Sequence, residues 1–325
     1  MLKNTGDTGC LLGKLRIIRH MESFYSKCEL CPRRCRAERN SGHLGMCRMG
    51  SLPIVNLYGL HYGEEPVISG KNGSGTVFFE GCSLGCVFCQ NHLISRGVTG
   101  KGEVCDPSRL SEIFLELQSK GANNINLVTP MHFAPSVAEA IRISKDGGLA
   151  IPVALNISGY DLVSTLSMFD GLADIYLTDF KFYSSELSGM VCGAKDYKEV
   201  AQEALDEMVR QSGSPVLGSD GMLKRGVIVR HLMLPGKLFD TKKVLDLLLD
   251  RYGEKIIISL MNQYTPTTPA IEAVKKGKLP AGFTGRINPE HYNAMCDYLA
   301  LSGHPCCFMQ ETDASGDLFI PNFKT

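Results

Sequence analysis

Short apolar runs alternate with amphipathic stretches along most of the chain, starting near residue 75. The runs are rich in β-branched residues, whereas the stretches between them repeat apolar residues at helical spacing. This alternation predicts βα units and a parallel sheet. The predicted strands span residues 76–79, 125–128, 151–155, 174–177, 227–229 and 255–259.

Helices are expected between these strands. Asp106 followed by Pro107 is the order of an N-cap and a first helical residue, and the next residues place Leu110, Ile113, Phe114 and Leu117 on one face. We expect Asp240 to cap another helix, and further helices over 197–209 and 289–299.

Six βα units predict an α/β fold, a partial (βα)6 TIM-like barrel that is open on one side. A doubly wound parallel sheet is the alternative, and both folds gather functional side chains at the carboxyl ends of the strands. Polar residues do follow the predicted strands: Cys82, Thr129, Asn156, Asp179, Lys181, Arg230, His231, Asn262 and Gln263. We therefore expect the functional site at that edge of the sheet.

The thirteen cysteines fall into two tight groups and a scattered remainder. In a large chain without an export signal, such clustering indicates metal or iron–sulfur ligation rather than disulfides. The scattered cysteines are interpreted as small buried apolar residues or inert surface thiols. The groups are Cys28, Cys31, Cys35 and Cys47, then Cys82, Cys86 and Cys89; the remainder are Cys10, Cys105, Cys192, Cys296, Cys306 and Cys307.

Cys82, Cys86 and Cys89 form a C-x3-C-x2-C loop directly after the first predicted strand. Three thiolates on one tight loop suit three corners of a 4Fe–4S cluster. A structural zinc site needs a fourth ligand, and none stands nearby in the sequence; a zinc knuckle completed by a distant residue is the alternative. With three ligands, one iron is open to the amino and carboxylate groups of S-adenosylmethionine (SAM).

Cys28, Cys31, Cys35 and Cys47 offer four ligands, enough to close a metal site. Their spacing suits a structural zinc ion or a second iron–sulfur cluster equally, and both alternatives stay open. Arg33, Arg34, Arg36 and Arg39 lie around these cysteines, either to stabilise thiolate charge or as a solvated face.

The loop Cys82–Cys89 resembles the C-x3-C-x-aromatic-C hallmark of the radical SAM superfamily, with Phe88 as the aromatic residue. More closely, residues 28–323 are similar to proteins related to pyruvate formate-lyase activating enzyme, in the branch with an extra N-terminal cysteine cluster. Further matching segments are 63–66, 73–76, 126–130, 177–181, 229–236 and 260–266.

This resemblance implies a domain organisation and an activity. Residues 1–27 are an N-terminal extension, 28–70 a cysteine-rich metal-binding segment, and 71–325 a radical SAM core barrel with a C-terminal closing segment. The enzyme reductively cleaves SAM to a 5′-deoxyadenosyl radical, which abstracts hydrogen from a glycyl-radical-type protein or peptide. A flavodoxin- or ferredoxin-type donor supplies the electrons.

The resemblance also implies which residues contact SAM. Phe88 is expected to pack near the adenine. Activating enzymes hold the SAM amino group with a Gly-Gly-Glu motif after the second strand; this chain has Thr129 there, so Thr129 or its backbone substitutes. Asn156 and Ser158 are candidates to bind the ribose or methionine part, or else simply form a turn.

Two more strand ends carry charged candidates. Asp179 and Lys181 match an Asp-x-Lys pattern, in which Lys181 offsets the SAM carboxylate and Asp179 orients Lys181; a rim ion pair is the alternative. Neighbouring residues of a strand face opposite ways, so only one of Arg230 and His231 faces the site, and we favour Arg230.

Charge and hydropathy narrow the function classes. The 34 basic and 34 acidic residues balance, which gives no field to attract nucleic acid or an anionic membrane. The absence of a long apolar run and of a secretory signal predicts a cytoplasmic protein without a membrane partner. Two alternatives remain: a radical SAM enzyme acting on a small molecule or RNA, and a non-catalytic iron–sulfur or zinc protein.

Overall fold

The six predicted strands all form and lie next to one another in a single sheet. The structure is a computed structural model that describes residues 21–310, 321, 323 and 324. Five of the six strands begin within two residues of the predicted start, and the fifth strand along the chain begins four residues earlier than predicted. They are β2 (Ser74–Phe79), β4 (Ile125–Val128), β5 (Val153–Ile157), β6 (Ile175–Asp179), β8 (Leu223–Leu232) and β9 (Ile257–Met261).

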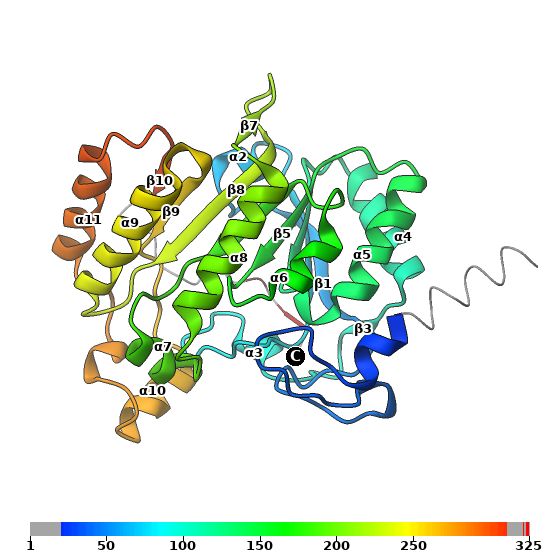
Figure 1. Ribbon diagram of the computed structural model, residues 1–325, viewed down its shortest axis with the longest axis horizontal. Coiled ribbons are helices and arrows are strands. Elements are labelled where there is room, and N and C mark those ends of the chain that lie inside the picture. The colour runs from blue at the N-terminus through cyan, green and yellow to red at the C-terminus, as the bar shows by residue number, and fades with distance from the viewer. Residues whose placement is uncertain (1–20, 311–320, 322, 325) are drawn as a thin grey trace, which may run out of the picture.

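These strands pair in parallel, and their order across the sheet follows their order in the chain (Figure 1). A doubly wound sheet reverses its strand order at a switch point. The described part of the sheet has no such reversal, so the doubly wound alternative is wrong.

Four shorter or flanking strands were not predicted. β1 (Ile54–His61) pairs antiparallel with β2, and β3 (Glu103–Val104) continues from β1 to one edge. β10 (Cys307–Met309) adds a parallel strand beside β9 at the other edge, and β7 (Val216–Leu217) pairs with β8. Because β1 belongs to the main sheet, the segment that the sequence assigned to metal binding also contributes to the core sheet.

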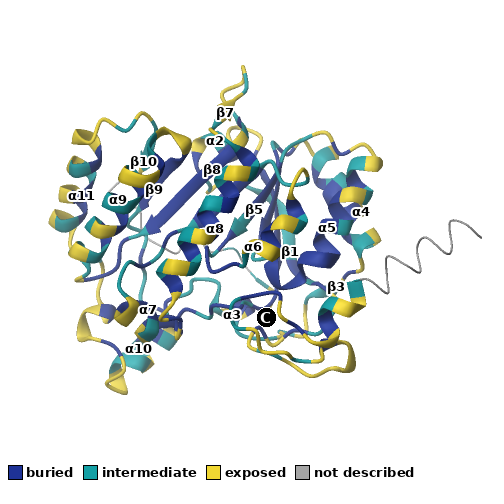
Figure 2. Ribbon diagram, in the orientation of Figure 1, coloured by how far each residue is buried: buried dark blue, intermediate teal, exposed yellow. Residues whose placement is uncertain are grey.

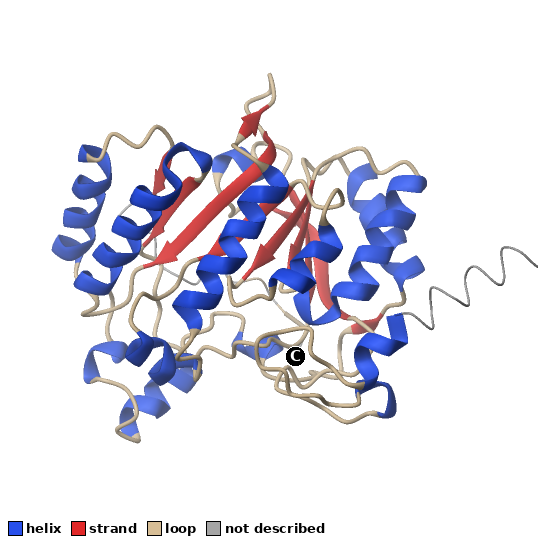
Figure 3. Cartoon of the chain, in the orientation of Figure 1, coloured by secondary structure: helices blue, strands red, loops and turns tan. Residues whose placement is uncertain are grey.

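The helices beside the sheet bury the faces that are turned towards it and expose the opposite faces to solvent (Figures 2 and 3). The predicted apolar face of α4 is confirmed, since all four of its named residues are buried and Asp106 caps the helix. The helices are α2 (Pro66–Ser69), α3 (His92–Ser95), α4 (Pro107–Ser119), α5 (Ala134–Asp146), α6 (Val163–Leu166), α7 (Ser185–Cys192), α8 (Tyr197–Ser212), α9 (Leu238–Tyr252), α10 (Thr268–Lys275) and α11 (Pro289–Leu301).

Asp240 does not cap α9, contrary to the sequence prediction. The helix begins at Leu238, and Asp240 lies within its first turn. Its carboxylate instead accepts hydrogen bonds from the backbone N–H groups of Tyr183 at 3.1 Å and Ser184 at 2.8 Å. Asp240 therefore ties the loop after β6 to α9, because two otherwise unpaired backbone donors of that loop point at it.

The cysteine-bearing segments lie together at one end of the sheet. In Figure 1 the strand arrowheads point towards the end where the N-terminal loops and α3 lie, whereas α2 closes the opposite end. Ile68 of α2 is buried against a cluster that includes Leu177 and Ile228, so α2 forms an apolar floor. No described helix combines the length and apolar character that crossing a bilayer requires.

Candidate active site

The loop that carries Cys82, Cys86 and Cys89 leaves β2 through a glycine. Gly81 has a φ of +83°, and a Cβ there would lie 2.8 Å from the carbonyl oxygen of Cys47. Only glycine accommodates both the left-handed backbone and this close approach. The chain therefore turns sharply out of the sheet, with the N-terminal cysteine segment packed against the turn.

Two of the three thiols accept a hydrogen bond from a nearby polar group. Cys82 Sγ accepts from the N–H of Leu84 at 3.4 Å, and Cys89 Sγ accepts from Ser95 Oγ at 3.5 Å. Burial raises the pKa of Cys82 to about 12, and burial also raises the pKa of Cys89. Deprotonating these thiols therefore needs a strong nearby positive charge, and a bound metal supplies one.

All ten residues that the sequence proposed for this site line one cavity of about 570 Å³. Its walls come from the cysteine loop and from the carboxyl ends of β4, β5, β6, β8 and β9. The ten residues are Cys82, Cys86, Phe88, Cys89, Thr129, Asn156, Ser158, Asp179, Lys181 and Arg230. The structure thus brings together side chains that are far apart along the chain.

Asp179 and Lys181 form an ion pair inside the cavity rather than on an exposed rim. Their charged atoms are 2.5 Å apart, and both side chains are mostly buried. Burial alone lowers the pKa of Lys181, but the charge and hydrogen bond of Asp179, together with the nearby Cys86 and Cys89, raise it overall. Lys181 is therefore a firmly protonated cation close to two of the cysteines.

Arg230 faces the cavity, as expected, but its charge is already balanced. Its Nε donates to Glu65 at 2.9 Å, and its Nη2 donates to Glu64 at 2.5 Å and also to Glu65. His231 faces away from the cavity and bonds the carbonyl oxygen of Phe180 at 2.7 Å. The two carboxylates hold Arg230 at the end of the cavity nearest α2, and its contact with SAM stays a prediction.

Glu64 and Glu65 were missed as site residues. Residues 63–66 stood out in the sequence only as a matching segment, and they do not follow a predicted strand. In the structure, Glu64 also accepts from the side-chain amides of Asn126 at 2.8 Å and Asn156 at 3.5 Å. Pattern reasoning could not find them because they enter the cavity from the loop between β1 and α2.

Thr129 is held in an unusual backbone conformation at the end of β4. Its φ is +60°, a left-handed value that is a genuine outlier for a β-branched residue. Its N–H donates to the carbonyl oxygen of Asn156 at 2.8 Å. Such strained residues concentrate at functional sites, which agrees with the position of Thr129 in the cavity wall.

Phe88 packs in an aromatic group at the cavity wall. Its ring centre is 6.1 Å from that of Phe182 and 6.2 Å from that of Tyr264. Tyr264 is in turn fixed by a hydrogen bond to the carbonyl oxygen of Phe283 at 2.7 Å. Phe88 therefore lies in a fixed orientation next to Cys89.

The four N-terminal cysteines also come together. Cys28, Cys31 and Cys47 are buried and Cys35 is exposed. Burial raises the pKa of Cys31 to about 12, and the charges of the other three cysteines act in the same direction, which shows that they lie within electrostatic reach. Within the described residues, no three or more His, Cys, Asp or Glu side chains surround a single-ion position.

Comparisons with known proteins found distant relatives. No family model matches the chain. The uncharacterized protein MJ0674 of Methanocaldococcus jannaschii is 29% identical over 260 residues, which cover 77% of this chain and 70% of that protein.

Two solved structures show a distant likeness. SuiB of Streptococcus suis bound to S-adenosylmethionine aligns with 71% of this chain at 11% identity and a TM-score of 0.48. Native anSMEcpe with bound AdoMet also aligns with 71% of it, at 11% identity and a TM-score of 0.45. The chain spans 48% of the length of SuiB and 61% of that of anSMEcpe. At this distance neither structure defines the function of the chain.

Cys192 is buried, one of the two states expected for the scattered cysteines, and it also contacts the three-cysteine loop. It lies at the end of α7, where its thiol donates to the carbonyl oxygen of Ser188 at 3.0 Å and is hydrogen-bonded to Cys86. The N–H of Val87 also donates to the carbonyl oxygen of Val191 at 2.9 Å. The end of α7 therefore supports the cysteine loop, which sequence spacing alone cannot reveal.

Asp161 is a further missed residue close to the site. It is buried, and its Oδ2 has no hydrogen-bond partner among the residues that the structure describes. Burial, with the charge of Asp179 as a second cause, raises the pKa of Asp161 to about 7. No spacing pattern marks this residue, because its environment depends on how the loop after β5 folds back on β6.

Proposed function

We propose that this chain is a radical SAM enzyme that holds a 4Fe–4S cluster with Cys82, Cys86 and Cys89. The observation that carries the proposal is that three cysteines of one loop line the same cavity as the polar ends of β4, β5, β6 and β8. Three thiolates from one loop suit three irons of such a cluster. The adjoining cavity has room for a small molecule of the size of SAM.

The residues present fit both groups. Lys181 is a buried cation beside Cys86 and Cys89, so it favours their thiolate forms and can pair with the SAM carboxylate. Thr129, Asn156 and Ser158 offer polar atoms for the ribose or methionine part, and Phe88 offers an aromatic wall for the adenine. Asp179 holds Lys181 in place.

The reaction class follows from these groups. A 4Fe–4S cluster held by Cys82, Cys86 and Cys89 would supply the electron for reductive cleavage of SAM to methionine and a 5′-deoxyadenosyl radical, which would abstract a hydrogen atom from the substrate. The chain positions SAM and excludes water from the cavity. We propose a glycyl-radical-type protein or peptide as the substrate, a partial (βα)6 barrel as the scaffold, and a flavodoxin- or ferredoxin-type electron donor.

Cys192 favours one second candidate, a closed and non-catalytic cluster with four cysteine ligands. However, Cys192 touches Cys86 itself. Cys192 does not line the cavity that Cys82, Cys86 and Cys89 line, so it lies behind Cys86 as seen from the cavity. We therefore favour three ligands and an open iron.

Release of 5′-deoxyadenosine tests the proposal. Protein reconstituted without oxygen and given dithionite and SAM is expected to release it, and Cys86→Ala to lose this activity. Cys306→Ala, outside the cavity lining, is the matched control and keeps it. Cys192→Ala separates the two candidates: continued release supports an open iron, whereas a Cys192→Ala protein without a cluster supports four cysteine ligands.

A further inference from the structure

Arg33 connects the two cysteine groups. It lies between Cys31 and Cys35, but its side chain extends to the three-cysteine loop (residues 82–89). There Nε donates to the carbonyl oxygen of Ser83 at 3.1 Å and Nη2 donates to that of Leu84 at 3.2 Å.

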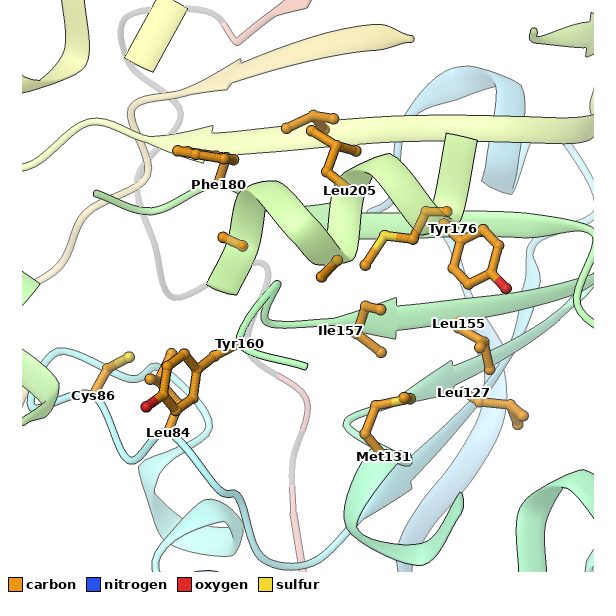
Figure 4. Packing of buried hydrophobic residues seen from close by; sticks show 14 of the residues in the cluster. Leu84, Cys86, Leu127, Met131, Leu155, Ile157, Tyr160, Tyr176, Phe180 and Leu205 are labelled. Atoms are coloured by element: carbon orange, nitrogen blue, oxygen red, sulfur yellow. The ribbon is translucent and has the colours of Figure 1, made fainter. Parts of the chain in front are cut away.

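The same guanidinium also binds the end of α7. Nη1 donates to the carbonyl oxygen of Gly193 at 2.6 Å, and Nη2 donates to that of Cys192 at 2.6 Å. Its central carbon lies 5.2 Å from the ring centre of Tyr160, which belongs to the same buried cluster as Leu84 and Cys86 (Figure 4). Arg33 therefore joins three segments through four carbonyl groups and one aromatic ring.

The other three arginines of the N-terminal group behave differently. Arg39 is buried and donates to Cys28 Sγ at 3.5 Å and to the carbonyl oxygen of His132 at 2.6 Å, so its contacts outside the segment go to the loop after β4. Arg36 is exposed and pairs with Glu29 at 2.7 Å, and Arg34 is exposed as well. Among these four residues, Arg33 is thus the one whose described contacts reach the three-cysteine loop.

The position of Arg33 depends on the fold of the N-terminal cysteine segment (residues 28–47). This segment makes few regular elements, and left-handed backbone at Arg34 and Arg36 shapes it around the cysteines. A metal held by Cys28, Cys31, Cys35 and Cys47 would organise such an irregular segment. Loss of that metal would then free the backbone that aims Arg33.

We infer that Arg33 is a positioning residue through which metal at the N-terminal cysteine segment determines how firmly the three-cysteine loop holds its cluster. This inference rests on the proposed function, because it requires a cluster at Cys82, Cys86 and Cys89. Mutating a residue that hydrogen-bonds to a metal ligand commonly weakens metal binding by roughly 10–100-fold. The hydrogen bonds from Arg33 to the carbonyl oxygens of Ser83 and Leu84 fix the backbone between two of the cysteine ligands, and we expect an effect of the same size.

The test measures how fast a ferrous chelator removes the cluster that responds to SAM. This cluster is followed in reconstituted full-length protein by the change that SAM causes in its EPR spectrum after dithionite reduction. Arg33→Met keeps an apolar stem but removes all five donors, and we expect roughly tenfold faster loss. Arg33→Lys keeps the charge, yet one ammonium cannot span four carbonyls, so it is also expected to lose the cluster faster. Arg36→Met is the matched control and should match the wild type.

A double-mutant comparison tests the route. Cys31→Ser, which damages the N-terminal site, should accelerate cluster loss, and adding Arg33→Met should accelerate it no further. If Arg33→Met and Arg33→Lys, folded by circular dichroism, retain the SAM-responsive signal as the wild type does, the inference is wrong. Full additivity with Cys31→Ser also contradicts it. A wild type that shows no SAM-responsive signal contradicts the proposed function itself.

Discussion

Asp161 combines burial with a missing hydrogen-bond partner for Oδ2 within the described part of the chain. A carboxyl group in that setting is more stable with its proton, and the pKa of Asp161 is raised to about 7 by burial and then by Asp179. This single side chain therefore makes the stability of the fold depend on pH.

We expect stability to fall as pH rises from about 4 to 7. Between the ordinary pKa of 3.8 and the folded value, the folded state keeps a proton that the unfolded state has released, so raising the pH favours unfolding. The contribution is of the order of 4 kcal/mol. Urea unfolding of Asp161→Asn across this range should show a flatter profile than the wild type, and an unchanged slope rejects the assignment.

Arg230 is the other side chain with a large expected effect. Arg230→Met leaves Glu64 and Glu65 buried without their cation, which should cost about 3–5 kcal/mol of unfolding free energy at neutral pH. Burial raises the pKa of Glu65, but Arg230 lowers it overall. Without Arg230 the buried carboxyl group takes up a proton more readily, so the loss of unfolding free energy should be smaller at acidic pH. Adding Glu64→Gln and Glu65→Gln should restore most of the stability; wild-type stability of Arg230→Met alone contradicts this account.

The turn after β5 brings two strand ends into contact. Gly159 has a φ of +76°, and an added Cβ would overlap with the carbonyl oxygen of Asp179 at the end of β6. The side chains of Ser158 and Asp179 both line the cavity, so this contact sets the width of the site.

Gly159→Ala should therefore destabilise the protein through both backbone strain and overlap. Gly171→Ala is a matched control, since Gly171 has a φ of +72° and nothing within 4 Å of the added Cβ. Left-handed backbone strain should cost each variant about 1–2 kcal/mol of unfolding free energy. Only Gly159→Ala should lose more, because only its Cβ overlaps with a neighbouring atom. Thermal unfolding measures the difference, and equal losses would show that the close approach is unimportant.

The six parallel strands could be predicted because each contains a short run of mostly apolar residues that is buried in the sheet. β1 was missed because it is only partly buried and pairs antiparallel, and β10 because it has three residues. Asp240 was misjudged because its partners, Tyr183 and Ser184, lie in a distant loop. Local pattern thus specifies elements, while contacts between loops appear only in three dimensions.

The two cysteine segments form one end of the molecule, and the cavity lies between the three-cysteine loop and the sheet. Spacing predicted both cysteine groups, and strand ends predicted the residues around the cavity. Sequence patterns could not predict that Arg33 and Cys192, which are distant in the chain, both contact the three-cysteine loop.

Removing metal should loosen the N-terminal cysteine segment before the sheet. Arg34, Arg36 and Arg48 are exposed in this segment or directly after it, so trypsin can cleave there once the backbone opens. Chelator-treated protein should be cut between residues 34 and 48 much faster than metal-loaded protein, as mass spectrometry of the fragments can show. Equal cleavage rates would mean that the segment folds without metal.

In the proposed enzyme, SAM binds an iron that no cysteine occupies. Electron–nuclear double resonance of the dithionite-reduced protein, with SAM isotopically labelled at its amino nitrogen, tests it most directly. We predict a coupling between the labelled nitrogen and the cluster, present in Cys192→Ala and lost in Cys86→Ala. A reduced cluster without such coupling, or zinc at the three-cysteine loop, would contradict the account.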